Sequence, residues 1–439
     1  MFQRVSLGGC LMIEKLLKSK VAKNASWLIA GRVVQMVLSF FVGLLTARYL
    51  GPGNYGLISY AGTYTTFFAS LCTLGINSII VKNFIDYPEE EGVTLCTAIA
   101  LRAISSVASL VTIVGISFIA DKGEPVTQII VFLCAIGMIF QIFDTFNYWF
   151  QAKLQSKYSA IATLVAYVAV SSYRIVLLAL KKDVQWFALA SSIDYIVLAC
   201  FLAVTYKMKG GPRFRFSWEK GKQLLGESYN FILSGLMVSI YGSTDRFMLK
   251  QMINEESVGF YATALALCNM WVFVLAAIID SVTPPIMQAH GVDNMLYEKR
   301  NRQLYAIVFY VSAAVSIGFM LFGGIAIRIL YGEAYMGAVA PLRIITWYTA
   351  FSYLGVARNA WIVCEHKQLY LKYLYFGAAI TNILLNAILI PRWGASGAAM
   401  ASLLTQVSTI LGFPALIKDL RPNVKLMIDA VFLKDVFNK

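Results

Sequence analysis

Charged side chains and histidines are scarce in this chain. Only 14% of its 439 residues are Asp, Glu, Lys or Arg, and it has two histidines, His290 and His366. Soluble globular domains carry about 25% charged residues, and their helices need a charged face toward water. A soluble fold is therefore excluded. Both histidines fall in polar breaks between apolar segments, so we expect no histidine proton relay inside a membrane.

The sequence also lacks the motifs of nucleotide, metal and catalytic sites. It contains no Gly-x-x-x-x-Gly-Lys-Ser/Thr loop, and its seven cysteines show no metal-binding spacing. These absences argue against a self-contained ATP-driven pump, and we predict no catalytic residues, no metal site and no cofactor. The net charge of +14 comes without a nucleic-acid motif. We expect no nucleic-acid partner, because basic residues collect on the cytoplasmic loops of membrane proteins.

Hydrophobic residues make up 59% of the chain and fall into blocks of the length that crosses a bilayer. Backbone groups in a bilayer must be satisfied within the segment, so each block should be a helix. The fold class that we predict is an all-α integral membrane protein with twelve transmembrane helices. The expected spans are 25–49, 57–81, 94–120, 126–150, 158–180, 185–206, 228–252, 258–284, 304–330, 338–362, 369–390 and 396–417.

The distribution of basic residues predicts that both termini are cytoplasmic. With twelve spans, 24 of the 37 Lys and Arg residues fall on the side of the termini and seven on the other side. The two halves of the chain resemble a doubled unit, which is a common plan of transporters. The predicted parts are an N-terminal tail (1–24), a first lobe (25–206), a basic linker (207–227), a second lobe (228–417) and a C-terminal tail (418–439).

Several polar side chains lie inside the predicted spans, where they are costly unless they face an interior or a wet cavity. The candidate cavity residues are Arg32, Gln35, Arg174, Tyr241, Asp245, Arg246, Arg343 and Arg358. Arginine is permanently charged and binds phosphate oxygens through a planar fork. Many arginines with few carboxylates therefore indicate an anionic ligand.

Several polar residues of the predicted spans could instead have a purely structural role. Arg32 could extend its side chain to the membrane surface, and we expect Arg102 to do so. Asp245 and Arg246 project about 100° apart on a helix, so we expect one to pack and only the other to face substrate. Asn382 and Asn386 are expected to make hydrogen bonds between helices.

Four stretches resemble polysaccharide flippases of the O-antigen (Wzx-type) kind, within the multidrug/oligosaccharidyl-lipid/polysaccharide exporter superfamily. They are GRVVQMVLSFFVGLLTARYLGPGNYGLISYA, YWFQAKLQSKYSAIA, DRFMLKQMINEESVGFYATALAL, and ARNAWIVCEHKQ followed by NILLNAILIPRWGASGAAMASLLTQ. The resemblance covers residues 24 to about 417. Many relatives have an acidic residue late in the twelfth span, where this chain has Thr405 and Gln406.

The resemblance implies two six-helix lobes around a central cavity that opens alternately to each side. It implies translocation of an undecaprenyl-diphosphate-linked oligosaccharide across the bacterial inner membrane, from the cytoplasmic to the periplasmic leaflet. Coupling to protons, sodium or the membrane potential is possible, and the expected partners are membrane lipids, a polysaccharide polymerase and a chain-length regulator. The alternatives are an ion-coupled drug or metabolite exporter of the same superfamily, and a polymerase or ligase of the same pathway.

Overall fold

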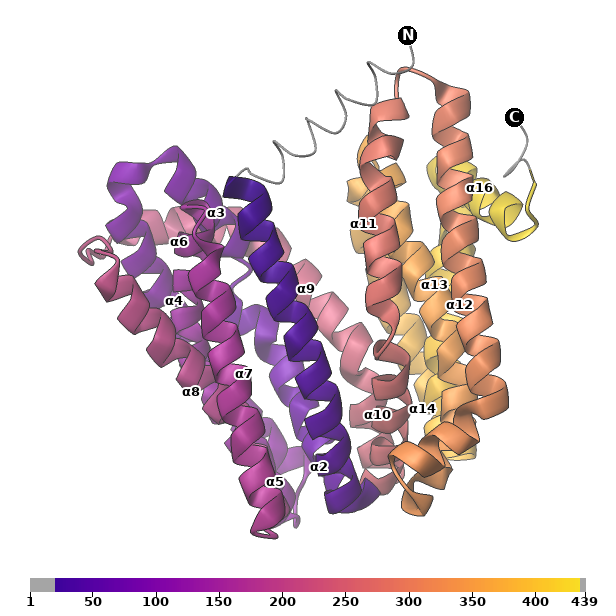
Figure 1. Cartoon of the computed structure of the whole chain (residues 1–439), viewed down its shortest axis with the longest axis horizontal. Coiled ribbons are helices and arrows are strands. Elements are labelled where there is room, and N and C mark those ends of the chain that lie inside the picture. Colours follow the sequence, from indigo (N-terminus) through magenta and orange to yellow (C-terminus); the bar gives the residue numbers. More distant parts are fainter. Residues whose placement is uncertain (1–19, 435–439) are drawn as a thin grey trace. The chain divides into compact units, whose positions relative to one another are not determined.

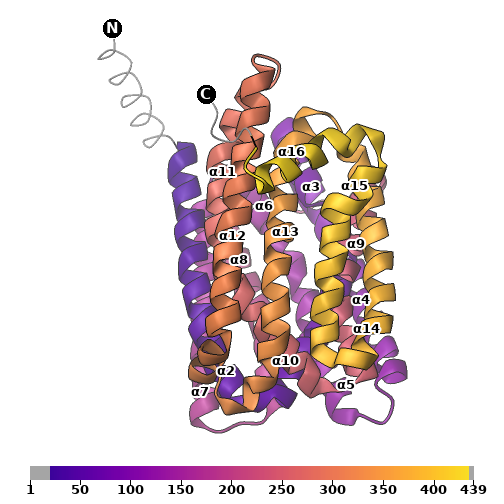
Figure 2. The ribbon, with the colours of Figure 1, turned by 90° about the vertical axis from the view of Figure 1, so that its right-hand side faces the viewer.

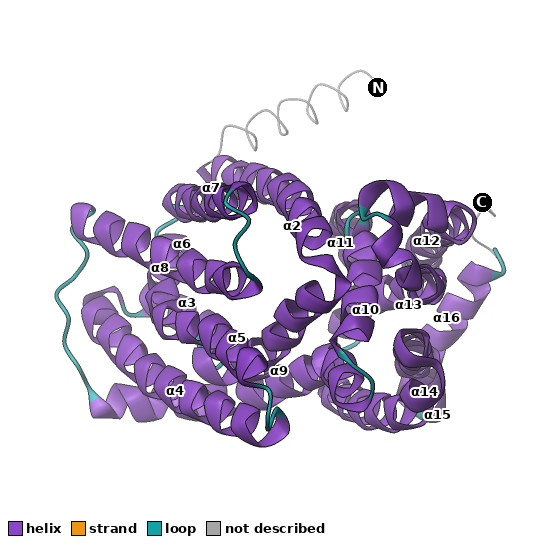
Figure 3. Ribbon diagram, turned by 90° about the horizontal axis from the view of Figure 1, so that it is seen from below, coloured by secondary structure: helices purple, strands orange, loops and turns teal. Residues whose placement is uncertain are grey.

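The computed structural model describes residues 20–434, with side chains from residue 35 onward except Val37. All regular structure within this range is helical, and it contains no strand (Figure 3). The chain forms two compact units. One runs up to Thr46 and resumes over Tyr64–Leu236, and the other comprises Ala47–Thr63 and the chain from Met237 onward.

The first unit is built from long helices that are drawn in indigo to magenta (Figure 1). It contains most of α2 (Lys20–Thr73), α3 (Asn77–Asp86), α4 (Glu91–Ala120), α5 (Pro125–Ala135), α6 (Thr145–Ala152), α7 (Ser156–Ala179), α8 (Val184–Met208) and the start of α9 (Trp218–Met252). Helix α8 packs against both α5 and α7, and α4 packs against α5. A buried aromatic cluster including Phe146, Trp149 and Tyr206 fills one end of this unit.

From Met237 onward the second unit is drawn in pink to yellow (Figure 2). After α9 it contains α10 (Glu255–Asn269), α11 (Val272–Ala289), α12 (Asn294–Leu330), α13 (Val339–Cys364), α14 (Leu371–Val407), α15 (Phe413–Leu416) and α16 (Arg421–Val431). Helix α13 packs against α10, α12 and α14, so it lies at the centre of this unit. The short α16 packs against α12.

The helices agree with an all-α membrane protein and are consistent with the twelve predicted spans. Eight helical stretches of the described chain are long and apolar enough to cross a membrane. Two of them, Leu38–Asp86 and Gln368–Leu416, have 49 residues each, and about 20 suffice for one crossing. Each contains a non-helical glycine, Gly51 or Gly394, between two predicted spans. Helices α9 and α13 cover the seventh and tenth predicted spans.

Three predicted spans contain breaks that the sequence did not indicate. The second is divided between α2 and α3. The eighth is divided between α10 and α11. In the fourth, a 3₁₀ segment over Ile136–Asp144 separates α5 from α6. Ser192 of α8 supports this break, because its hydroxyl accepts from the Gly137 amide (2.9 Å) and donates to the Leu133 carbonyl (2.5 Å). Such support satisfies backbone groups that a broken membrane helix releases.

Two glycines of the recognised motifs allow two helical turns of the second unit to touch. A Cβ on Gly259 would lie 2.8 Å from the carbonyl carbon of Pro52, and a Cβ on Gly56 would lie 2.8 Å from the amide nitrogen of Gly259. No side chain fits at such distances. The same segment is fixed by Tyr335, whose hydroxyl donates to the Ala47 carbonyl (2.6 Å). The motif thus encodes a close backbone contact.

The predicted basic linker, 207–227, packs onto the first unit. The Ser217 amide donates to the hydroxyl of Thr97 (3.1 Å), and Lys220 forms an ion pair with Glu90 (2.9 Å). The extended part of this segment appears in Figure 3 as the long loop that joins α8 to α9. The linker is therefore fixed to the end of α4.

Candidate functional site

A buried carboxylate, Asp245 of α9, organises the polar interior of the second unit. Its side chain is 5% exposed. Oδ1 accepts hydrogen bonds from the amide nitrogens of Asn382 (3.0 Å) and Asn386 (2.6 Å). Oδ2 accepts from the hydroxyls of Tyr261 (2.5 Å) and Ser402 (2.5 Å). All four donors are neutral, so these hydrogen bonds compensate the carboxylate without an ion pair.

Side chains of α10 and of both arms of α14 contact this carboxylate of α9. Both arms reach it because α14 reverses direction. The two asparagines lie one turn apart before the break at Gly394, which has φ 53°, and the serine lies after it. The two arms approach so closely that a Cβ on Gly397 would lie 2.6 Å from the carbonyl carbon of Leu389. Glycine is therefore required at this turn, and the turn brings both arms of α14 to Asp245.

The cluster has one more hydrogen-bond contact than it has hydroxyl protons when Asp245 is ionised. Oδ2 of Asp245 and the hydroxyl oxygens of Tyr261 and Ser402 form a triangle whose third side, between the hydroxyls, is 2.9 Å. When the aspartate is ionised, two hydroxyl protons serve three contacts. A proton on the carboxyl group would complete the triangle. Oδ1 of Asn386 is also buried and lacks a hydrogen-bond partner among the described residues.

A second polar contact lies one helical turn away on the same two helices. Tyr241 of α9 donates to the side-chain oxygen of Gln406. Both residues lie four positions from a member of the Asp245 cluster, so the two contacts share one face of each helix. This glutamine of the twelfth predicted span is thus joined to α9 through a neutral hydrogen bond.

Arg246 is attracted electrostatically to the adjacent Asp245, but its hydrogen bond goes to another residue. Its Nη2 donates to the Ser243 hydroxyl (3.2 Å), and its buried Nε has no hydrogen-bond partner among the described residues. The two side chains diverge as expected for neighbours on a helix. The aspartate is engaged by neutral donors, whereas the arginine keeps unused hydrogen-bonding capacity.

The two candidate arginines of α13 are in different surroundings. Arg343 is exposed. Arg358 is 3% exposed, and its Nη1 donates to the backbone carbonyl of Thr409 (3.3 Å). Thr409 belongs to a π-helical turn over Ser408–Gly412, and such turns leave carbonyl groups that need another donor. Arg358 thus supports this turn.

The remaining candidates lie on helices of the first unit. Gln35 of α2 and Arg174 of α7 are half-buried, and Arg174 is attracted electrostatically to Asp194 of α8. Arg32 is in α2, but its side chain is outside the described residues. The structure therefore brings Tyr241 and Asp245 into one polar layer. That all eight residues line a common cavity remains a prediction.

The expectation that Arg102 extends to the membrane surface is wrong. Its side chain on α4 is 0% exposed, and Nη1 donates to the hydroxyl of Thr145 (2.9 Å). Its guanidinium lies 6.0 Å from the ring centre of Tyr148 and is attracted electrostatically to Asp144. Nε and Nη2 have no hydrogen-bond partner among the described residues. Packing against the α5–α6 break keeps this cation inside the first unit.

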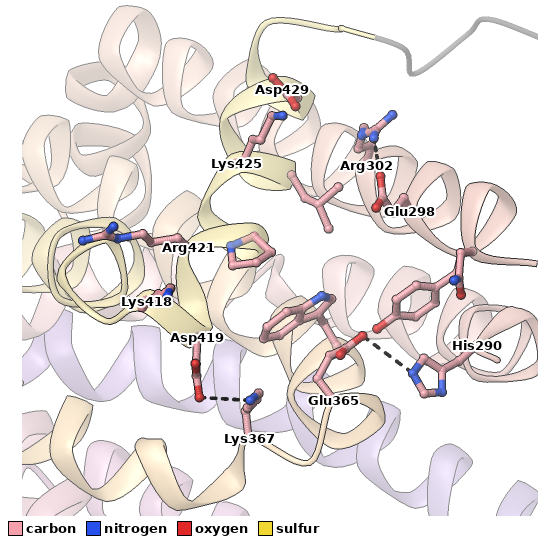
Figure 4. A pocket seen from close by; sticks show the side chains of 15 residues that line it. His290, Glu298, Arg302, Glu365, Lys367, Lys418, Asp419, Arg421, Lys425 and Asp429 are labelled. Atoms are coloured by element: carbon pink, nitrogen blue, oxygen red, sulfur yellow. Dashed lines mark hydrogen bonds and ion pairs between the residues drawn. The ribbon is translucent and has the colours of Figure 1, made fainter.

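A separate polar pocket of about 1040 Å³ opens at one end of the second unit, where α11, α12, α13 and α16 meet (Figure 4). Arg302 forms an ion pair with Glu298 beside it (2.6 Å), and Nε2 of His290 lies 3.6 Å from Oε1 of Glu365. Asp419 accepts hydrogen bonds from Tyr370 (2.8 Å) and from the Lys367 ammonium (3.1 Å). These bonds hold the pKa of Asp419 below its usual value. Two pairs of opposite charge, Arg302 with Glu298 and Lys367 with Asp419, thus line the pocket.

The sequence identified part of the Asp245 cluster. The prediction that Asn382 and Asn386 bond between helices is confirmed, since both donate to α9. Tyr261 and Ser402 were not singled out as partners of Asp245. Tyrosine and serine are common in membrane helices, and nothing local distinguishes a carboxylate partner. The one available signal was their position within the recognised motifs.

Comparison with protein families gives one match, to the model described as polysaccharide biosynthesis protein, over residues 21–290. The chain belongs to this family. An uncharacterised membrane protein of Methanocaldococcus jannaschii is 20% identical over 415 residues, covering 89% of this chain and 96% of the relative.

Solved structures of the MOP superfamily share the fold. The lipid II flippase MurJ, in an inward closed conformation, matches with a TM-score of 0.72 and 14% identity, over 93% of this chain and 91% of MurJ. An inward-facing multidrug resistance MATE transporter gives 0.64 and 18%, over 89% and 96%. A Pyrococcus furiosus transporter of the superfamily gives 0.63 and 15%, over 93% and 98%. The predicted resemblance is thereby confirmed for the family and for the fold, and the protein is a multi-pass membrane protein.

Proposed function

We propose that this protein is a flippase that moves undecaprenyl-diphosphate-linked oligosaccharide units from the cytoplasmic to the periplasmic leaflet of a bacterial inner membrane. The polysaccharide biosynthesis family supports this substrate class, and the likeness to a lipid II flippase supports the same type of transport. A polysaccharide polymerase and a chain-length regulator would then receive the translocated units. Both termini would lie in the cytoplasm.

Coupling of this transport to an ion would depend on Asp245. The environment of this residue is the observation that carries the proposal. The carboxylate is buried inside a membrane helix bundle and is surrounded by neutral donors. Ionisable groups at such positions usually serve transport, because an inert apolar residue would be less costly there. Uptake of a positive charge would neutralise Asp245 and change how α9 is bound to both arms of α14.

A proton is the ion that the cluster fits best. Protonation supplies the hydrogen that the triangle of Asp245, Tyr261 and Ser402 lacks when the carboxylate is charged. A sodium ion would need the asparagine amides to turn their oxygens inward. Oδ1 of Asn386 has no partner among the described residues, and it could coordinate the sodium ion after the amide group rotates.

Arg246 would be the member of the Asp245–Arg246 pair that faces substrate. Its Nε has no partner among the described residues, and a guanidinium matches the oxygens of a diphosphate. Arg32, Arg174 and Arg343 would contribute further positive charge along the path. Arg358 would serve mainly to hold the last span, through its bond to Thr409.

The test uses purified protein in liposomes that contain a fluorescent undecaprenyl-diphosphate-linked oligosaccharide. A lectin added outside reports how much substrate reaches the outer leaflet after a proton or a sodium gradient is imposed. We expect appearance of substrate driven by the proton gradient, and no transport of a cationic dye. Transport of the dye without the oligosaccharide would instead support the drug exporter, and failure of both substrates would contradict the proposal.

A further inference from the structure

An apolar groove runs along the surface of the first unit between α7 and α8. It has a volume of about 690 Å³ and is lined by Ile161 of α7 and, on α8, by side chains that include Ile196, Cys200, Val204 and Met208. These α8 residues recur every four positions, so they form one stripe along the helix. Val204 is 57% and Met208 79% exposed in the structure. The groove is therefore exposed on the surface of the first unit.

The groove has the length of one leaflet of a bilayer. From Ile196 to Met208 the helix rises about 18 Å, and half of the hydrocarbon core is about 15 Å thick. The predicted topology places the Met208 end at the cytoplasmic surface. The groove would thus cover the cytoplasmic leaflet from near the bilayer centre to the head groups.

A lysine and a tyrosine close the groove at this end. Lys209 is exposed, and its ammonium group lies 4.6 Å from the ring centre of Tyr158. This cation–π contact fixes the ammonium at the level where an apolar chain would end and a head group would begin. Lys207 lies two residues away and is also exposed. No carboxylate is among the residues that line the groove.

We propose that this groove binds one anionic phospholipid of the cytoplasmic leaflet. One acyl chain lies along Ile196, Cys200 and Val204, and the head-group phosphate contacts Lys209. An apolar lining accounts for the chain, and the lysine accounts for the charge of the head group. The site is separate from the Asp245 cluster, because it lies on the first unit, so it neither requires nor tests the proposed transport.

A cysteine inside the groove permits a direct test. Cys200 is the one exposed cysteine of the described chain. A thiol-reactive fluorophore is attached to the full-length protein in liposomes, and the signal of a Cys200→Ser variant is subtracted. Quenching is then measured with brominated phosphatidylglycerol and brominated phosphatidylcholine. We expect half-maximal quenching at about fivefold lower phosphatidylglycerol, as for one basic residue near an anionic head group.

Two variants and a competitor decide the origin of the preference. Lys209→Gln should remove the difference between the two lipids, whereas Lys122→Gln, which changes an exposed lysine outside the groove, should leave it intact. Equal quenching by both lipids in the unchanged protein, or a preference that survives Lys209→Gln, would overturn the proposal. Undecaprenyl phosphate displacing phosphatidylglycerol at equal concentration would also overturn it, because the occupant would then be a polyprenyl carrier.

Discussion

Both units bury charged side chains, and two of these, Arg102 and Asp245, are compensated in different ways. Asp245 in the second unit accepts four hydrogen bonds from neutral groups. Arg102 in the first unit makes one hydrogen bond, and two of its nitrogen atoms have no partner among the described residues. Its charge is offset by Asp144 and by the ring of Tyr148.

The difference indicates different tasks. A carboxylate can lose its charge by taking up a proton. A guanidinium stays charged at every accessible pH. We infer that Asp245 changes state during transport, whereas Arg102 keeps the broken fourth span in place. Four changes to the protein would break or sharpen this comparison.

The largest effect is expected from Asp245→Asn. The asparagine has the same shape but cannot exchange a proton, so transport of lipid-linked oligosaccharide should fall about 100-fold, near the upper limit of coupling between two sites. The assay is lectin access in liposomes. Asp419→Asn, an exposed acid of the same unit, should transport normally. Equal rates in the two variants would remove Asp245 from the mechanism.

Removal of the charge of Arg102 should mainly affect stability. Arg102→Met leaves Asp144 without its compensating cation and should lower the free energy of unfolding by about 3 kcal/mol, as for breaking a buried pair. Arg102→Lys keeps the charge and should lose less. The measurement is denaturant unfolding in detergent micelles. A methionine variant as stable as the parent protein would show that the charge has no structural role.

Gly259→Ala should destabilise the end of the second unit that holds α9 and α10. The added Cβ would meet the carbonyl carbon of Pro52 at 2.8 Å, so the backbone must shift at a cost of about 1–3 kcal/mol. Gly318→Ala is the matched control, because nothing lies within 4 Å of its added Cβ. Thermal unfolding of both variants measures the difference, and equal melting temperatures would refute the close contact.

The smallest effect is expected at Asp419, the exposed counterpart of the buried acid. Its pKa is lowered in the folded protein by hydrogen bonds from Tyr370 and Lys367. Its contribution to stability is therefore present above the unfolded pKa of about 4 and is lost as pH falls through the folded pKa. The melting temperature of Asp419→Asn should lie slightly below that of the parent protein at neutral pH and approach it in acid. A constant difference across this range would contradict the assignment.

The sequence predicted those features that depend on composition and periodicity. Span length located most helices, and the breaks at Gly51 and Gly394 fall between predicted spans. Helix geometry predicted that Asp245 and Arg246 diverge, and Asn382 and Asn386 were expected to make hydrogen bonds between helices. The burial of Arg102 and the contact of Tyr261 and Ser402 with Asp245 could not be predicted. They depend on which helices are neighbours, and neither charge nor period encodes that.

Proton movement during transport tests the central claim most directly. A pH-sensitive dye is enclosed in liposomes that contain the protein, and the lipid-linked oligosaccharide is then added without any imposed gradient. If Asp245 couples transport to protons, addition of substrate should change the internal pH in the parent protein and not in Asp245→Asn. Substrate translocation with no pH change, or an equal change in both proteins, would contradict the account.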